Sequence, residues 1–411
     1  MTMIKIDQYF DPAAWGKFTK AAEGRDTPFL IVDLNRIKLK FNEMIGLFPE
    51  AKVHYAMKAS PAVQVIELLA ELGSNFDCAS IYELDRVLDC GVAPSRISYG
   101  NTIKKAKHVK YAFDKGIDLY ATDSEADLKN IAEQAPGSKV FVRILVEGSD
   151  TAEWPLSRKF GCHPDMAVDL LIQAKELGLV PYGVSFHVGS QQKSVAVWHD
   201  ALVMVKDIFD KLMSEQGIKL QMINLGGGFP ARYLNQINTI QDYAGSVKQY
   251  LVDSYGIDDM PEIILEPGRS LVASSGVLVS EVVLISRKSH EEETRWVYTD
   301  VGLFQGLIET LGEAIKYPVY TPKMATSTTS GTVVLAGPTC DSADIMYEET
   351  DYQLPQELEI GDKIYWLATG AYTNSYSSVE FNGFPPLEVV YLYQLYLLFL
   401  LQQLQFQLQK V

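Results

Sequence analysis

The sequence predicts an α/β fold, a (β/α)8 TIM-like barrel followed by a mostly β domain. Eight short apolar runs, each followed by a stretch with helical spacing, fill the first two-thirds of the chain. Two of the stretches, AVQVIELLAELG and MAVDLLIQAKELG, close with glycine as helices do. Such barrels carry their active sites at the C-terminal ends of the strands, so we expect the polar residues there to form one site. The eight runs are Val53–Lys58, Phe76–Ser80, Ile97–Gly100, Leu119–Asp123, Val140–Leu145, Tyr182–Ser190, Ile223–Gly228 and Ile263–Gly268.

The rest of the chain divides into three further parts. Residues 1–34 contain one strand-like run, PFLIVDL, and we expect this segment to join the β domain. The barrel is predicted to span residues 35–273. Residues 274–387 carry β-branched and aromatic runs bounded by turn residues, which are typical of a β sandwich or β barrel. Residues 388–411 form an atypical tail rich in Leu, Gln and Tyr.

A membrane anchor is the less favoured interpretation of the tail. Its longest unbroken apolar run, Leu395–Leu401, is shorter than the ~20 residues that a spanning helix needs. Residues Gln402–Val411 alternate polar and apolar side chains, as an edge strand would, and such a segment is prone to aggregate. A packed or altered terminus is therefore favoured, and no membrane partner is expected.

Charge and cysteine content bound the partners and the compartment. The 411 residues carry a formal net charge of −16 and no basic stripe, so a nucleic-acid partner is not expected. This charge suits a cationic substrate, although many cytosolic proteins are equally acidic. Four cysteines without CxxC spacing, and no signal peptide before them, predict reduced thiols and a cytoplasmic location.

Lys58, in the segment HYAMKAS, ends the first predicted strand. Taken alone, a lysine at the end of a strand is usually a solvated surface group. In a barrel mouth, however, a partly desolvated amine with a lowered pKa forms a Schiff base with an aldehyde.

A phosphate site is predicted beside it. The glycines of LGGGFP, residues 226–228, follow the seventh run, and the EPGR segment with Arg269 follows the eighth. Loops at these two positions of a barrel commonly hold a phosphate. Glycines let backbone N–H groups approach the oxygens, and arginine supplies a permanently charged donor. A triple glycine alone is equally a flexible turn.

Further polar residues at the strand ends complete the expected site. A carboxylate at Glu266 would keep a pyridine nitrogen protonated, although it could form a plain ion pair with a neighbouring arginine. His187 could stack on the ring or be a hydrogen-bonded core histidine, and the Ser190 hydroxyl could reach the phosphate. Asp77 and Arg143 are expected to form a charge pair. Together the lysine, the phosphate site and the carboxylate indicate pyridoxal 5′-phosphate.

Seven ordered motifs resemble those of the fold-type III pyridoxal-phosphate decarboxylases of basic amino acids, a group related to alanine racemase. The resemblance runs from about residue 25 to 387 and is strongest to bacterial ornithine or lysine/ornithine decarboxylases. It implies an alanine-racemase-like barrel with a C-terminal β domain. The motifs are HYAMKAS, FDCAS, SFHVGSQ, NLGGGFP, EPGR, GPTCDSADI and GAYTNSYSSVEFNGFPP.

The resemblance assigns roles residue by residue. Lys58 matches the Schiff-base lysine, His187 the ring-stacking histidine and Glu266 the partner of the pyridine nitrogen. Asp77 and Arg143 join the cofactor-binding set. The remaining cofactor contacts that the resemblance implies are Ser190, Gly227, Gly228, Gly268, Arg269 and Tyr372.

The resemblance also implies a homodimer with shared active sites. Cys340 and Asp341 match residues that the neighbouring subunit inserts, the cysteine to reprotonate the substrate carbon and the aspartate to bind the distal ammonium. Alternatively, Cys340 is a small buried apolar residue without a catalytic role, as free cysteines usually are. Lys159 and Asp344 resemble residues that form a salt bridge across the dimer interface of the family.

The expected reaction is decarboxylation of L-ornithine to putrescine and CO2, a step of polyamine biosynthesis. Glu313 is expected near the distal amine, Phe304 stands where a tyrosine is usual in the eukaryotic enzymes, and Phe384 is expected to form an apolar wall. Lysine, or lysine and ornithine together, remain alternative substrates. Diaminopimelate is disfavoured because contacts for a second carboxylate are not found, and Glu266 disfavours racemisation. A non-catalytic regulatory homologue is the remoter alternative.

Overall fold

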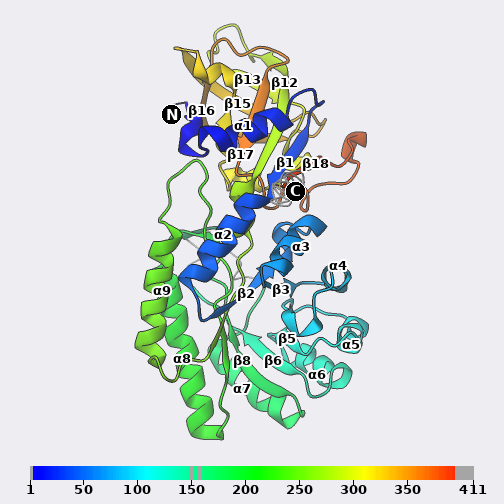
Figure 1. The fold of residues 1–411 in the computed structure, drawn as a ribbon, viewed down its shortest axis with the longest axis vertical. Coiled ribbons are helices and arrows are strands. Elements are labelled where there is room, and N and C mark those ends of the chain that lie inside the picture. Colours follow the sequence, from blue (N-terminus) through cyan, green and yellow to red (C-terminus); the bar gives the residue numbers. More distant parts are fainter. Residues whose placement is uncertain (1–2, 148–150, 155–158, 394–411) are drawn as a thin grey trace, which may run out of the picture.

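A closed barrel of eight parallel strands forms the larger part of the computed structural model, which describes residues 3–147, 151–154 and 159–393 (Figure 1). The barrel closes where β11 pairs with β2, with Ile263 opposite Ala51. The fold class predicted from the sequence is thereby confirmed. The strands are β2 (Ala51–Ala56), β3 (Asn75–Cys78), β4 (Ile97–Tyr99), β5 (Leu119–Thr122), β6 (Lys139–Arg143), β8 (Val180–Ser185), β10 (Met222–Asn224) and β11 (Glu262–Leu265).

Helices surround the barrel on its outer side (Figure 1). Apolar residues at helical spacing form their inner faces; in α7, for example, Val168 and Leu171 are buried. Polar caps fix where the helices start, as in α9, where Thr239 and Asp242 form a capping box. The barrel helices are α2 (Leu34–Leu47), α3 (Val63–Glu71), α4 (Ile81–Asp89), α5 (Ala106–Asp114), α6 (Glu125–Gln134), α7 (Pro164–Glu176), α8 (Ala196–Gln216), α9 (Ile240–Tyr255) and the short α10 (Arg269–Val272).

Each barrel strand ends one to five residues before the end of the apolar run that predicted it. The largest difference is at β8, which ends at Ser185, whereas the run continues to Ser190. Ser190 instead starts β9 (Ser190–Gln192), which pairs with β7 (Ala152–Trp154) in a small sheet that the sequence did not predict. The predicted site residues therefore lie mainly in the connections after the strands.

A second domain consists mainly of a mixed sheet with the order β14-β17-β12-β13-β15-β16. The N-terminal strand β1 (Phe29–Asp33) joins this sheet by pairing antiparallel with β12, as the sequence predicted. Helix α1 (Pro12–Ala21) covers β1 with Phe18, which is fully buried. The other strands are β12 (Gly276–Ser286), β13 (Arg295–Thr299), β14 (Val319–Tyr320), β15 (Ser330–Ala336), β16 (Ile345–Pro355) and β17 (Lys363–Leu367).

The start of the predicted tail belongs to this sheet. Strand β18 (Glu388–Leu392) pairs parallel with β1, and Val389 and Tyr391 pack on the core. The boundary predicted at residue 388 therefore differs from the structure, because this β-branched segment completes the sheet edge. The predicted edge strand at 402–411 lies outside the described residues. In the described part, no helix is long and apolar enough to cross a membrane.

His54 lies inside the barrel wall on β2 and is 4% exposed. Its Nδ1 lies 3.1 Å from the Ser98 hydroxyl. Burial, with the positive charge of Lys52, lowers the pKa of His54 from 6.5 to about 3. Between the two pKa values, about 3 and 6.5, the imidazole is therefore neutral in the folded protein and protonated in an unfolded chain.

Replacing His54 by Gln should reduce the acid sensitivity of folding. A histidine pKa that is lower in the folded state stabilises the fold fully above its unfolded pKa, and this stability is lost as the pH falls below it. Between pH 7.5 and 5.5 the wild type should lose about 1 kcal/mol more unfolding free energy than the His54→Gln variant. Denaturant titrations at both pH values measure this difference, with the exposed His163→Gln as control. An equal loss in wild type and variant would contradict the interpretation.

Candidate active site

The mouth of the barrel gathers polar side chains from the connections that follow its strands. Two adjoining hollows lie there, one of about 30 Å³ and one of about 320 Å³. They share four lining residues, so we describe them as parts of one site. The shared residues are Lys58, Ser190, Arg269 and Tyr372.

Lys58 lies in a 3-10 turn directly after β2 and projects into both hollows. Protein atoms surround its side chain, but solvent reaches the side chain through the open hollow. Burial alone would lower the pKa of the Lys58 ammonium. Electrostatic interactions with Tyr372, Asp77 and Glu266 outweigh burial, so this pKa is raised instead. The expectation of a lowered pKa was therefore wrong for this structure.

The second domain holds the Lys58 turn from the other side. The Tyr372 N–H donates to the carbonyl of Ala59 at 2.8 Å, and the Ser375 hydroxyl donates to the carbonyl of Lys58 at 3.1 Å. Tyr372 has a positive φ of 56°, which turns its backbone toward the barrel. The Lys58 main chain is thus fixed by both domains.

Asp77 and Arg143 both line the larger hollow, but no ion pair joins them within the described residues. Asp77 is 8% exposed, and burial together with the nearby Glu266 raises its pKa well above the ordinary value. The Arg143 guanidinium stacks over Phe160, with Cζ 4.8 Å from the ring centroid. The predicted charge pair is therefore a longer-range attraction instead of a direct contact.

The small hollow is formed by glycines whose backbone comes close to neighbouring chain. A Cβ at Gly228, where φ is +98°, would lie 2.6 Å from the carbonyl oxygen of Gly189. A Cβ at Gly227 would lie 2.6 Å from the carbonyl oxygen of Glu266. Side chains at these positions would fill the hollow or displace its walls. Gly268 lines the same hollow.

Arg269 closes this hollow and is 4% exposed. Its Nε and Nη2 donate to the Ser190 hydroxyl at 3.2 and 3.1 Å, and its Nη1 donates to the Tyr233 hydroxyl at 2.8 Å. Its guanidinium also forms a two-bonded ion pair with Glu309, at 2.6 and 2.5 Å. Neither Tyr233 nor Glu309 was predicted from the sequence.

Glu266 and His187 face the small hollow together. The Asn224 amide donates to a carboxylate oxygen of Glu266 and so orients it. The Gly189 N–H donates to Nδ1 of His187 at 3.0 Å. Burial, with the charges of Arg143 and Lys58, holds the pKa of His187 well below its ordinary value. The imidazole is therefore neutral at physiological pH.

The structure brings Glu309, and not Glu313, to the larger hollow. The Glu313 carboxylate accepts from the N–H groups of Glu348 and Glu349, each at 2.7 Å, and from Thr350. These donors lower its pKa in spite of partial burial. Residues 311 and 312 have non-helical backbone angles and interrupt the helical turn between the two glutamates. A count of residues along the sequence therefore could not predict which glutamate faces the hollow.

Three residues expected at the substrate lie outside the hollows of their own chain, and two of them, Cys340 and Asp341, are predicted to come from a partner subunit. Cys340 and Asp341 are exposed, and Phe384 is half-buried. The Asn382 side chain accepts from the Cys340 N–H at 2.9 Å, which links the two loops that carry Cys340 and Phe384.

The predicted interface pair is also separated in the single chain. Asp344 is 3% exposed and accepts from the N–H groups of Leu303 and Thr339 at 2.7 and 3.0 Å. Lys159 lies over the ring of Phe160, with Nζ 5.1 Å from the centroid. A salt bridge from Lys159 to Asp344 of a partner stays a prediction.

The residues present fit pyridoxal phosphate. The glycine-lined hollow with Arg269 and Ser190 suits a phosphate, which would be bound by N–H groups and a fixed guanidinium. Lys58 would carry the Schiff base, and Glu266 would face the pyridine nitrogen. Neutral His187 would offer a flat ring without a competing charge.

Replacing Gly228 by Ala should weaken retention of the cofactor. The added Cβ meets backbone at a positive φ, and such strain costs of order 1–3 kcal/mol. We expect pyridoxal phosphate to bind roughly ten-fold more weakly or worse. Equilibrium dialysis measures this affinity. Gly245→Ala, on α9, meets no atom within 4 Å and should bind like the wild type. Equal affinity in both variants would contradict the assigned phosphate position.

Known proteins are similar to this chain over most of its length. Ornithine decarboxylase of Saccharomyces cerevisiae is 33% identical over 384 residues, covering 88% of this chain and 80% of that protein. Antizyme inhibitor 2 of Xenopus laevis is 34% identical, covering 90% of this chain and 81% of that protein. The structure of lysine/ornithine decarboxylase from Vibrio vulnificus, complexed with cadaverine, superimposes with a TM-score of 0.84 at 25% identity. It covers 94% of this chain and all of that chain.

The match to a protein family covers most of the site. Residues 34–273 match the family described as "Pyridoxal-dependent decarboxylase, pyridoxal binding domain". This range includes Lys58, His187, Glu266 and Arg269. The chain therefore belongs to the pyridoxal-dependent decarboxylases, and its cofactor is pyridoxal phosphate.

Proposed function

We propose that this protein decarboxylates L-ornithine to putrescine and CO2, with Lys58 binding the cofactor and Cys340 of the partner subunit donating the proton. One observation carries the proposal: the glycine-lined phosphate site opens into a hollow of about 320 Å³ lined by Lys58 and two acidic side chains. The acids are Asp77 and Glu309. A hollow of this size and charge suits a small diamino acid.

The acid that binds the distal amine is assigned to Glu309 in place of Glu313. Glu309 is 4% exposed and lines the hollow, whereas the Glu313 carboxylate is occupied by backbone donors of β16. Arg269 holds Glu309 in one orientation through two hydrogen bonds and leaves further lone pairs for an ammonium. Asp341 of the partner subunit is proposed as the second contact.

The residues of this chain have separate roles in the reaction. When bound, pyridoxal phosphate withdraws electrons from the substrate Cα, so that the bond to the carboxylate can break. Glu266 keeps the pyridine nitrogen protonated, and Asn224 orients that carboxylate. Arg269, Ser190 and the glycines bind the phosphate.

The proton and the product are handled by two further groups. The thiol of Cys340, from the partner subunit, donates a proton to Cα after CO2 has left. The Lys58 amine then displaces the product amine and returns the site to its starting state. Phe384 of the partner subunit is proposed to lie against the substrate carboxylate and exclude water.

The arrangement of the single chain supports a shared site. Cys340 and Phe384 lie on neighbouring exposed loops and outside their own chain's hollows. A second chain that brought these loops to the barrel mouth would supply a proton donor and an apolar wall together. The proposed active form is therefore a homodimer.

Two other functions have specific support. The Vibrio vulnificus neighbour is a lysine/ornithine decarboxylase, which favours lysine as a second substrate for this fold. The similarity to an antizyme inhibitor favours a non-catalytic regulatory role. That second role is the weaker candidate, because this chain keeps Lys58, Arg269 and Cys340.

Purified protein loaded with pyridoxal phosphate should release CO2 from ornithine with a higher kcat/KM than from lysine, arginine or diaminopimelate. Trapped radioactive CO2 measures each rate. Lysine turnover equal to that of ornithine would assign dual specificity. No CO2 from any of the four substrates would refute the decarboxylase function.

Three variants separate the assigned roles in the same assay. Lys58→Ala should abolish release from every substrate. Glu309→Gln should raise the KM for ornithine roughly ten-fold or more, because a charge-assisted hydrogen bond contributes about 1.5–3 kcal/mol. Glu313→Gln should leave this KM within about two-fold of wild type and lower Tm, because it loses its bonds to β16. The reverse pattern would return the amine contact to Glu313.

Mixing two inactive variants tests the shared site. Lys58→Ala and Cys340→Ala homodimers should each be nearly inactive, but a mixed dimer contains one intact site. Random exchange of subunits should restore roughly a quarter of wild-type activity. Activity no higher than the sum of the parents would place Cys340 outside the partner's site.

A further inference from the structure

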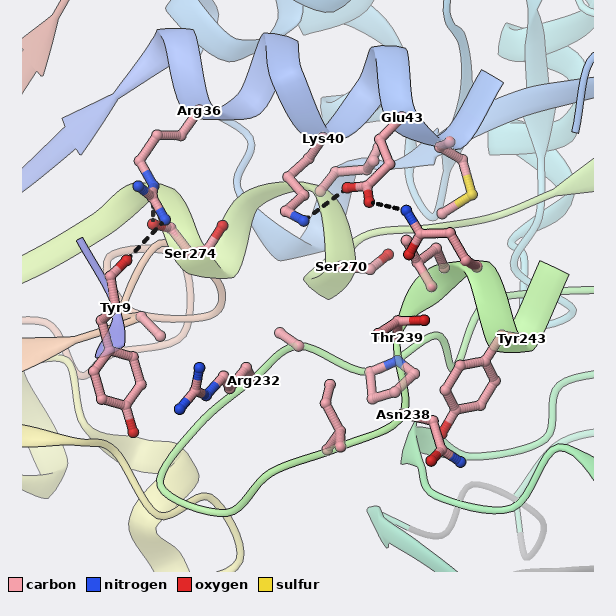
Figure 2. A pocket seen from close by; sticks show the side chains of 18 of the residues that line it. Tyr9, Arg36, Lys40, Glu43, Arg232, Asn238, Thr239, Tyr243, Ser270 and Ser274 are labelled. Carbon is pink, nitrogen blue, oxygen red and sulfur yellow. Dashed lines mark hydrogen bonds and ion pairs between the residues drawn. The ribbon is translucent and has the colours of Figure 1, made fainter. Parts of the chain in front are cut away.

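A second cavity, of about 490 Å³, lies on the other side of α10 from the cofactor site. It is larger than either hollow of the active site and shares no lining residue with them. Its walls come from α2, the connection at residues 230–241, α10 and the N-terminal residues 8–10 (Figure 2). Its volume is in the range of small-molecule sites, roughly 300–1,000 Å³.

Positive charge dominates the lining of this cavity. Arg36, Lys40 and Arg232 are cations, and Glu43 is the only carboxylate among the lining residues. The Glu43 carboxylate is already occupied, by Lys40 at 2.7 Å and by the amide of Gln241 at 2.8 Å (Figure 2). It therefore does not neutralise the two arginines.

Neither arginine forms an ion pair among the described residues, although Arg232 also interacts with the Tyr9 hydroxyl. Arg36 donates to the carbonyls of Ser274 at 2.8 Å and Tyr9 at 3.5 Å, and Arg232 donates to the carbonyl of Gln8 at 2.9 Å. No carboxylate lies within ion-pair distance of either guanidinium in the described part of the chain. Burial lowers the pKa of Arg36, and the more distant charges of Asp33 and Asp11 offset this only in part.

Aromatic rings fix the orientation of both guanidinium groups. Arg36 Cζ lies 4.5 Å from the ring centroid of Phe10, and Arg232 Cζ lies 4.8 Å from that of Tyr9. Fixed planar guanidinium groups match the paired oxygens of carboxylates and phosphates.

Buried hydroxyls add unused hydrogen-bonding capacity. The hydroxyls of Ser270 and Ser274 are shielded from solvent and have no hydrogen-bond partner in the part of the chain that the structure describes. Both residues line the cavity from α10 and the turn after it (Figure 2). Unsatisfied buried polar groups are uncommon and call for a ligand or an ordered water.

We propose that this cavity binds a small organic anion with at least two charged oxyanion groups, either phosphates or carboxylates. Arg36 and Arg232 are its charged contacts, and the serine hydroxyls donate to the same oxygens. The cationic lining repels diamines and polyamines, so the ligand is neither the substrate nor the product of the active site.

The position of the cavity links such a ligand to the cofactor. Ser270 directly follows Arg269, which closes the phosphate site. Pro230 and Ala231 follow the glycine segment that forms the other wall of that site. A bound anion therefore contacts both phosphate-binding segments from behind and should slow the loss of the cofactor.

Calorimetric titration of the holoenzyme tests the proposal with two probes, inorganic pyrophosphate and citrate. The enzyme is loaded with pyridoxal phosphate, so that the phosphate site is already filled. We expect one equivalent of probe to bind per chain, with binding of pyrophosphate alone indicating a phosphate ligand and of citrate alone a carboxylate. Absence of binding by both probes at millimolar concentration would overturn the proposal.

Matched variants locate the binding. Arg232 is exposed and can be changed to Gln without disturbing the core, and Arg232→Gln should weaken binding at least ten-fold. Arg287→Gln, on the exposed surface of the β domain, should leave it unchanged. Glu43→Gln removes the only carboxylate of the lining and should tighten binding. Weaker binding in Glu43→Gln, or unchanged binding in Arg232→Gln, would overturn the proposed site.

Discussion

The buried Arg269 guanidinium is the interaction on which the site depends. It stands at the start of α10, after the last barrel strand, and binds a serine from the β9 strand, a tyrosine from the connection after β10 and Glu309 from the second domain. Both members of the Arg269–Glu309 pair are about 95% buried. Removing two charges from water is costly, so such a pair is weak support for stability. Its consequence is geometric, because it fixes Arg269, which lines both hollows, and Glu309, which lines the larger one, relative to each other.

The same pair explains why the second domain matters to a site built on the barrel. Barrel connections supply Lys58, His187 and Glu266, but the β domain supplies Glu309 and Tyr372, and Tyr372 also holds the Lys58 turn. Strand β1 ties the two parts together by pairing with β12 and β18. The hollow is therefore defined only when both parts are folded and packed.

Local patterns were sufficient for the barrel and for the residues that follow its strands. Lys58, His187, Glu266 and the glycines could be found because strand ends meet at one rim by topology alone. Glu309 could not, since a kink at residues 311–312 decides which of two nearby glutamates reaches the hollow. The direction of the Lys58 pKa shift also depends on carboxylates from other strands, and no sequence pattern reports their distances.

The charged residues that line the cavity on one side of α10 differ from those that line the hollow on the other side. On one side the hollow presents the carboxyl groups of Asp77 and Glu309 beside the cations Lys58, Arg143 and Arg269. On the other side the cavity presents Arg36 and Arg232 without carboxylate partners in the described chain. In a medium of low dielectric constant, the cavity discriminates strongly against cationic ligands. The proposed anion site and the cofactor site thus lie against the same short helix, and Arg269 faces the cofactor site.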